Sequence, residues 1–352
     1  MPNTNPQTTT LEALDEKLAL LAGKSAVNYS CYFGATNNNY PQFAQLDKHR
    51  VCGVKLFMGS STGNMLVDRM ASLRNIFGGT DLLIAAHCED QGIIKENTDK
   101  YKKAYGDDVP LTLHPVIRSE EACYRSSELA VQLAREANAR LHIMHISTAR
   151  ELDLFSDAPL ITKRITAEAC VSHLLFTEDD YQTLGARIKC NPAIKTAEDR
   201  KALQEAVNSG LIDAIATDHA PHLLSEKEGG ALKAMSGMPM IQFSLASMLE
   251  LVDKDIFSIE KIVEKMSHAP AQMYEINNRG FIHKGYQADL VLVRPNSKWT
   301  VTTDCIVSKC QWSPLEGHTF NWKVEKTFVN GHLLYDNGKI DETYRGQELR
   351  FR

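Results

Sequence analysis

The sequence lacks several features that would each assign it to a particular class of protein. No run approaches the roughly 18 consecutive apolar residues of a membrane-spanning helix. The amino terminus has no basic stretch followed by an apolar one, as a secretory signal has. With a formal charge of −5, the chain has no excess of basic residues that would favour a nucleic acid. We therefore expect a cytoplasmic protein that binds neither membranes nor nucleic acids.

Cysteine pairs with the spacing of a structural site are also missing. The eight cysteines are scattered, none forms a Cys-x-x-Cys pair, and most lie within apolar runs. This pattern is typical of reduced core thiols in a cytosolic protein rather than of a disulfide framework or a zinc knot. The 352 residues are 43% hydrophobic and 24% charged. They suffice for a large α/β domain with a small appendage, or for two domains.

Short apolar runs alternate with helical patterns along most of the chain. Near-continuous apolar runs are typical of parallel strands that are covered on both faces, and their alternation with helices predicts a parallel sheet of six strands. The pattern changes in the last part, where Asn330-Gly331 predicts a tight turn between antiparallel strands. The six runs lie at 26–33, 51–58, 82–87, 141–145 and 160–170, and from residue 211 onward.

Residues suited to metal binding lie at or near the ends of four of these runs. Lys55 lies within one run, His87 and His145 end two others, and Asp218 follows the last. Because the carboxyl ends of parallel strands in a barrel share one mouth, we expect these side chains to converge. Histidine nitrogens and carboxylate oxygens suit zinc or a similar divalent ion. A lysine buried in a strand should be neutral or modified, and carbamylation would turn it into a carboxylate that can bridge two metals.

Each of these residues also has a purely structural explanation. Asp218 could cap the turn after its strand, and Lys55 could extend to solvent. His87 and His145 could each be a hydrogen-bonded residue beneath a loop. His142 lies near the start of its run, and this position indicates a structural role rather than a metal ligand. Because four coincidences at separate strand ends explain the pattern poorly, we favour the metal site.

Seven segments carry a more specific pattern: Met1-Pro-Asn-Thr-Asn-Pro6, Gly53-Val-Lys-Leu-Phe-Met58, Ala86-His-Cys-Glu89, His142-x-x-His145, Asn191-Pro-Ala193, Ala216-Thr-Asp-His-Ala-Pro-His222 and Ser308-Lys-Cys-Gln-Trp-Ser-Pro314. Together they resemble the dihydroorotase family of the amidohydrolase superfamily, from the first residue to about residue 337. The resemblance implies an α/β fold, a TIM-type (β/α)8 barrel of the metal-dependent hydrolase kind, over residues 1–275. A small β appendage and C-terminal tail would occupy residues 276–352.

The reaction that the resemblance implies is the reversible, zinc-dependent closure of N-carbamoyl-L-aspartate to L-dihydroorotate in pyrimidine (UMP) biosynthesis. Lys55 would be carbamylated and would bridge two zinc ions. His87 and His145 would bind the second ion, while Asp218 would bind the first and act as the catalytic acid and base. Asn3, Asn191 and His222 would hold the substrate, with Asn3 and His222 at its carboxylate. Glu168 and His173 would be further polar residues of the site.

One element of the family pattern is absent from these 352 residues. In the family, a first strand ending in His-x-His binds the first metal, and an arginine two residues later binds the substrate carboxylate; no His-x-His occurs here. Six strands also cannot close an eight-stranded barrel. We expect the sequence to lack about the first two strands of a longer dihydroorotase, and the 352 residues alone to bind the second metal weakly and show little activity.

Two other functions fit the same sequence. One is a catalytically inactive, dihydroorotase-like scaffold subunit, for instance associated with aspartate transcarbamoylase. The other is a related cyclic amidohydrolase, an allantoinase or a hydantoinase. A homodimer is a further partnership that the resemblance allows.

Overall fold

A curved parallel sheet forms the centre of the computed structural model, which describes residues 1–59 and 65–352. Its six strands follow one another in sequence order, and each is parallel to the previous one. This confirms the predicted α/β fold. Among the described residues β1 and β6 do not pair, so the sheet is curved but open. The strands are β1 (Cys31–Gly34), β2 (Val51–Phe57), β3 (Ile84–His87), β4 (Leu141–Ile143), β5 (Ile165–Cys170) and β6 (Ala214–Ala216).

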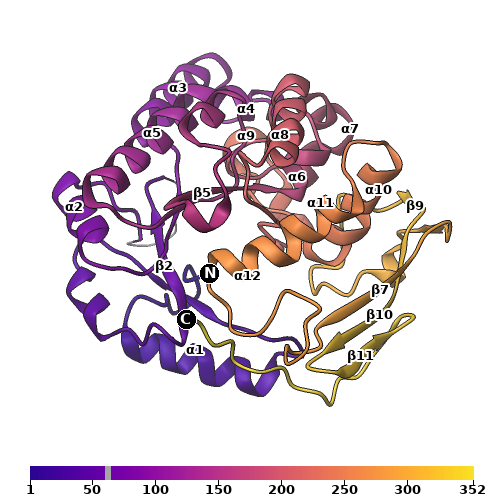
Figure 1. Ribbon diagram of the computed structural model, residues 1–352. Helices are drawn as coiled ribbons and strands as arrows, with labels where there is room; N and C mark the ends of the chain where they lie inside the picture. Colours follow the sequence, from indigo (N-terminus) through magenta and orange to yellow (C-terminus); the bar gives the residue numbers. More distant parts are fainter. Residues whose placement is uncertain (60–64) are drawn as a thin grey trace.

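Helices connect the strands and cover the outer face of the sheet. In Figure 1 they form an arc outside the strands, and the last strands of the chain, in yellow, lie at the end of this arc. The helices are α1 (Leu11–Lys24), α2 (Met70–Gly78), α3 (Gln91–Tyr105), α4 (His114–Ile117), α5 (Glu120–Ala137), α6 (Val171–Leu175), α7 (Tyr181–Leu184), α8 (Ala197–Ser209), α9 (Gly230–Lys233), α10 (Ser244–Asp253), α11 (Ile259–Val263) and α12 (Ala269–Met273).

The helix α5 shows how local sequence sets these elements. The hydroxyl of Ser119 accepts a hydrogen bond from the backbone N–H of Ala122, which caps the helix, and two glutamates in the first turn favour its positive end. Asn138 ends the helix in the left-handed conformation, with φ 50°. One face of the helix, including Ala130, Val131 and Ala134, is buried. Capping at both ends and one buried face thus define the helix over Glu120–Ala137.

Two of the six predicted runs become strands later than expected: β1 starts at Cys31 rather than at residue 26, and β5 also starts late. Leu160–Thr162 forms a short 3-10 turn, and the strand β5 starts only at Ile165. The sequence Ala-Pro-Leu before this turn places a proline at its N-cap, and proline lacks the N–H that a strand ladder needs.

The two faces of the parallel sheet carry different side chains, because successive residues of a strand point to opposite sides. Val54, Ile84 and Leu141 belong to the apolar core between sheet and helices. Their neighbours face the inside of the curve, where the pairing of strands aligns Lys55, Ala85, His142 and Thr166 in one row. Both faces are buried, but only the outer one is uniformly apolar.

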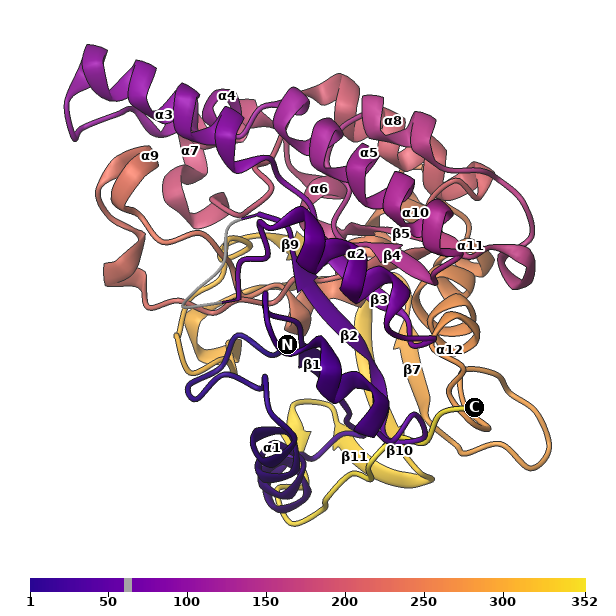
Figure 2. The ribbon, with the colours of Figure 1, turned by 90° about the vertical axis from the view of Figure 1, so that its left-hand side faces the viewer.

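The final part of the chain forms a smaller antiparallel sheet and then returns toward the parallel sheet. The hairpin of β10 (Lys323–Val329) and β11 (His332–Asp336) turns at Asn330-Gly331, as predicted. This sheet has the order β12 (Lys339–Ile340), β11, β10, β7 (Leu290–Arg294), and β8 (Trp299–Thr300) pairs with β9 (Thr319–Phe320). Figure 2 shows α1 and this hairpin at one end of the molecule and α3, α5 and α8 at the other.

Two observations bear on how the last part joins the rest. Trp312 and Phe320 pack into the main core, and the tail reaches the segment just before β1, where Leu349 N–H donates to the carbonyl of Tyr29. The division between residues 275 and 276 stays a prediction. Among the described residues, no helix combines the length and apolarity that crossing a bilayer requires.

Candidate active site

Lys55 lies in the middle of β2 and points into the curve of the sheet. Its side chain is 1% exposed; its Nζ lies 2.9 Å from the sulfur of Met144 and 4.5 Å from the centre of the Phe57 ring. Burial lowers the pKa of Lys55 to about 8, although the carboxylate of Asp218 acts to raise it. A larger fraction of the side chain is therefore a neutral amine near neutral pH, and the neutral amine is the form that reacts with carbon dioxide.

Asp218 follows β6 and interacts electrostatically with Lys55. Burial raises its pKa to about 6, Lys55 opposes this rise and Glu168 adds to it. The backbone at Asp218 is left-handed, with φ 41°, and so is the backbone at His145, also with φ 41°. This conformation is uncommon outside glycine and costs on the order of 1–3 kcal/mol where the surrounding structure enforces it, typically at functional sites.

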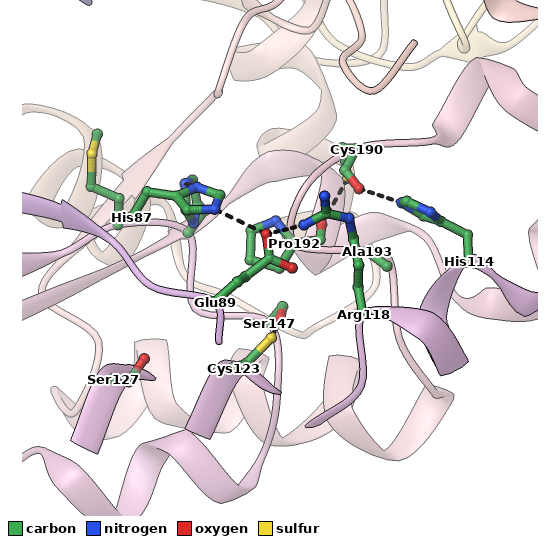
Figure 3. Close-up of polar contacts among 12 residues, drawn as sticks. His87, Glu89, His114, Arg118, Cys123, Ser127, Ser147, Cys190, Pro192 and Ala193 are labelled. Carbon is green, nitrogen blue, oxygen red and sulfur yellow. Dashed lines mark hydrogen bonds and ion pairs between the residues drawn. The ribbon is translucent and has the colours of Figure 1, made fainter. Parts of the chain in front are cut away.

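His87 and His145 bring two ring nitrogens together beside Lys55. The Nδ1 atom of His87 lies 3.1 Å from the Nε2 atom of His145, and both rings are buried. Burial lowers the pKa of both imidazoles, so both are neutral at physiological pH. The other nitrogen of His87 lies 2.9 Å from the carboxylate of Glu89, which also accepts a hydrogen bond from Arg118 (Figure 3).

The donor set fits one metal ion better than two. Two nitrogens bound to one tetrahedral zinc lie about 3.3 Å apart, close to the separation of the His87 and His145 nitrogens, and the Nδ1 of His145 has no hydrogen-bond partner in the described chain. A carbamylated Lys55 would add an oxygen ligand. In residues 1–59 and 65–352, no three or more His, Cys, Asp or Glu side chains group to hold a metal. For a second metal ion the chain has Lys55 and Asp218 as candidate ligands, but it lacks the His-x-His motif that supplies two more ligands in the family.

The predicted substrate residues lie in three segments. Asn3 is exposed; Pro2, beside it, packs against Gly34 at the carboxyl end of β1. The side-chain oxygen of Asn191 is buried without a hydrogen-bond partner in the described chain. The carbonyl of His222 accepts a hydrogen bond of 2.8 Å from the indole of Trp312. Through this bond, two of the specific sequence segments are joined.

Glu168 and His173 lie inside the protein in different surroundings. Glu168 accepts a hydrogen bond of 3.0 Å from the Nε2 of His142, and it influences both Lys55 and Asp218 electrostatically. His173 bonds through Nε2 to the carbonyl of Pro192 at 3.1 Å, next to Asn191. Burial lowers the pKa of His173 to about 4.

The sequence patterns did not identify the buried ion pair behind His87. Burial acts to raise the pKa of Glu89, but the charge of Arg118 and the hydrogen bond from His87 outweigh it and hold that pKa below the usual range. Glu89 had a local signal, because it stands two residues after the histidine at the end of a strand. Arg118 had none, since its link to Glu89 spans 29 residues.

Comparisons with known proteins agree with this architecture. The sequence profile of the Amidohydrolase family matches residues 67–334. A dihydroorotase of Halobacterium salinarum is 31% identical over 353 residues, which cover 99% of this chain and 80% of that protein. An allantoinase of Bacillus velezensis is 28% identical over 341 residues, which cover 96% and 74%. The solved structure of L-hydantoinase (dihydropyrimidinase) from Arthrobacter aurescens superposes with a TM-score of 0.91 at 27% identity, over 97% of this chain and 77% of that one. The chain thus belongs to the amidohydrolase family.

Proposed function

We propose that this amidohydrolase acts on a six-membered cyclic amide, L-dihydroorotate, in the reversible reaction with N-carbamoyl-L-aspartate. The observation that carries the proposal is that the ring nitrogens of His87 and His145 lie 3.1 Å apart near the buried amine of Lys55, which in turn interacts electrostatically with Asp218. Two of the four have a left-handed backbone. Relatives named dihydroorotase, such as those of Halobacterium salinarum and Pyrococcus furiosus, align along 99% of the chain.

Asp218 is the proposed acid and base. In the hydrolytic direction the ring C–N bond breaks, the oxygen of water joins the carbonyl carbon, and one of the water's protons ends on the departing nitrogen. A carboxylate within reach of both positions can carry this proton, and it does so most effectively when its pKa lies near the working pH. The partly buried position of Asp218, where desolvation raises its pKa to about 6, supports this role.

His87, His145 and a carbamylated Lys55 would hold a divalent cation, which we propose to be zinc. For the second zinc that the family resemblance implies, the described residues offer Lys55 and Asp218. When bound, such ions supply Lewis-acid polarisation of the amide carbonyl and acidify water. The two imidazoles contribute neutral nitrogen donors, because burial lowers their pKa values. Lys55 contributes its neutral amine to the carbamylation.

Asn3, Asn191 and His222 are the proposed substrate-binding residues. The unpaired, buried oxygen of Asn191 is suited to accept a hydrogen bond from a ring N–H. A second candidate is an allantoinase or hydantoinase activity, favoured by the allantoinase relative and by the hydantoinase structure at TM-score 0.91. The inactive scaffold, the homodimer, the association with aspartate transcarbamoylase and the cytoplasmic location stay predictions.

The test is turnover of three cyclic amides by the protein expressed from its own gene, with zinc and bicarbonate supplied. We expect kcat/KM for dihydroorotate to exceed that for allantoin and hydantoin by about tenfold or more. Asp218→Asn should lower kcat by about 10²- to 10⁴-fold, because it removes the proton carrier.

The control for this variant is Asp213→Asn, which removes a buried carboxylate at the start of β6 that pairs with Lys163 instead. It should change thermal stability more than kcat. Turnover of allantoin or hydantoin above dihydroorotate would support the second candidate, and zinc binding without any turnover would support the scaffold.

A further inference from the structure

We infer that Glu89, anchored by Arg118, is a positioning residue that fixes the imidazole of His87 with its Nδ1 facing the metal position. The inference rests on the proposed function, since it takes His87 to be a metal ligand. It assigns a role to an ion pair that is not itself among the proposed ligands or substrate-binding residues.

The contacts around Glu89 are short and closed to solvent. Glu89 is 0% exposed, and its Oε2 lies 2.9 Å from the Nε2 of His87. Arg118 donates from Nη1 to the same oxygen. Figure 3 shows the carboxylate between the His87 ring and the guanidinium. Because one oxygen receives both donors, the carboxylate cannot turn toward Arg118 without leaving His87.

This geometry selects one tautomer of His87. An ionised carboxylate only accepts hydrogen bonds, so the proton of the neutral imidazole must be on Nε2. Nδ1 then carries the lone pair of the ring, and this atom lies 3.1 Å from the Nε2 of His145. Fixing the metal-binding nitrogen through the hydrogen bond of the other one is a general property of histidine ligands.

Arg118 is itself held by an element that also reaches the proposed substrate site. It directly follows α4, and its backbone N–H donates to the carbonyl of His114 at the other end of that turn. The ring of His114 contacts the carbonyl of Cys190 at 2.9 Å (Figure 3), beside Asn191. Arg118, which holds Glu89 and through it His87, is thus fixed by contacts within the protein interior rather than lying on an exposed loop.

Stability alone does not account for the arrangement. The second carboxylate oxygen of Glu89 is buried without a hydrogen-bond partner in the described chain, which is unfavourable for the folded state. A buried ion pair is also weak evidence for a stabilising role, because both charges lose their hydration. What the pair does provide is a fixed acceptor at the Nε2 of His87.

The test compares Glu89→Gln with Glu151→Gln in the full 352-residue chain, with zinc affinity measured by competition with a chelator. Glu151 is the matched control, since it is another buried glutamate, 2% exposed, and is bound by the hydroxyls of Ser127 and Thr148. Glu89→Gln should weaken zinc binding by about 10- to 100-fold, the range for residues that orient a ligand, while Glu151→Gln should stay within about threefold.

A second readout needs neither metal nor activity. In the metal-free protein labelled with [15N]histidine, the ring nitrogen shifts should show His87 protonated on Nε2, and Glu89→Gln should mix the two tautomers. A purely structural role would not move this equilibrium. His87 protonated on Nδ1 in the unsubstituted protein would overturn the inference.

His87→Ala separates failure of the inference from failure of the proposed function. If His87→Ala loses zinc while Glu89→Gln keeps native affinity and a single tautomer, the positioning role is wrong and the metal site stands. If His87→Ala keeps native zinc affinity, the metal site and the inference both fall. Should Glu89→Gln not fold, Arg118→Lys replaces it, because lysine keeps the charge but loses the planar fork, and it should weaken zinc binding in the same direction.

Discussion

Two buried histidine–glutamate pairs lie in the same parallel sheet, and they differ in what the second ring nitrogen contacts. His87 bonds to Glu89 at 2.9 Å, and its Nδ1 faces another histidine. His142 bonds to Glu168 at 3.0 Å, but its Nδ1 lies 2.9 Å from the hydroxyl of Thr166. The His142 ring therefore has a conventional partner on both sides, whereas the His87 ring keeps one nitrogen directed at another potential ligand.

The difference shows that burial and a carboxylate partner do not by themselves indicate a metal ligand. Both histidines are nearly inaccessible to solvent, at 4% for His87 and 0% for His142. A hydroxyl can donate to or accept from a ring nitrogen, so it satisfies His142 completely. The facing nitrogens of His87 and His145 can share one proton in a hydrogen bond. When His145 carries its proton on Nδ1 instead, both facing lone pairs are available to a cation.

The largest expected effect is on zinc affinity, which should differ when the histidine of each pair is replaced. His87→Ala should weaken zinc binding by about 100-fold or more, because a direct ligand is lost and ligands matter more than the residues that support them. His142→Ala should leave zinc affinity unchanged and instead lower the midpoint of thermal unfolding, since Glu168 loses its hydrogen bond from the His142 ring. Isothermal titration with zinc and a thermal melt on both variants measure these two quantities. Equal losses of zinc affinity in the two variants would contradict the difference between His87 and His142.

His173 resembles His142 at one ring nitrogen and lacks a partner at the other among the described residues, and its effect on stability can be tested by changing the pH. One of its nitrogens bonds to the carbonyl of Pro192, and the other has no partner in the described chain. Its pKa is lowered from 6.5 to about 4, so the unfolded chain binds the extra proton between these values. The stability that neutral His173 contributes is complete above pH 6.5 and is lost as pH falls toward 4.

His173→Gln should therefore make the protein less sensitive to acid. Between pH 7.5 and pH 5 the native chain should lose about 2 kcal/mol more unfolding free energy than the variant does. Urea unfolding at the two pH values measures this difference. Parallel losses in both proteins would assign the acid sensitivity to other buried histidines, such as His114, whose pKa burial also lowers.

The smallest expected effect comes from making His142 resemble His87. Thr166→Val removes the hydroxyl partner of His142 Nδ1 with little change in shape, and should lower the free energy of unfolding by about 1 kcal/mol. It should create no new zinc site, because in the described part of the chain the partner of this nitrogen is the Thr166 hydroxyl and not a second ring nitrogen. Urea unfolding and a zinc titration give the two values. An additional tightly bound zinc would mean that an unpaired ring nitrogen is sufficient on its own.

The sequence by itself determined the kind of sheet and the places where its chemistry lies. Apolar runs alternating with helices led to six parallel strands in order, because hydrophobic periodicity is a local property of the chain. Lys55, His87, His145 and Asp218 were selected by their positions in or after these runs. The Asn330-Gly331 turn followed in the same way from two adjacent residues.

The tertiary structure alone decided which polar side chains meet. His142 and His145 are three residues apart, yet one faces Thr166 and Glu168 on the next strand and the other faces His87 on the previous strand. The pairing of Glu89 with Arg118 and the left-handed backbone of His145 and Asp218 left no pattern in the sequence. The physical reason is that a hydrogen bond depends on distances of about 3 Å between atoms, and packing between segments remote in sequence sets those distances.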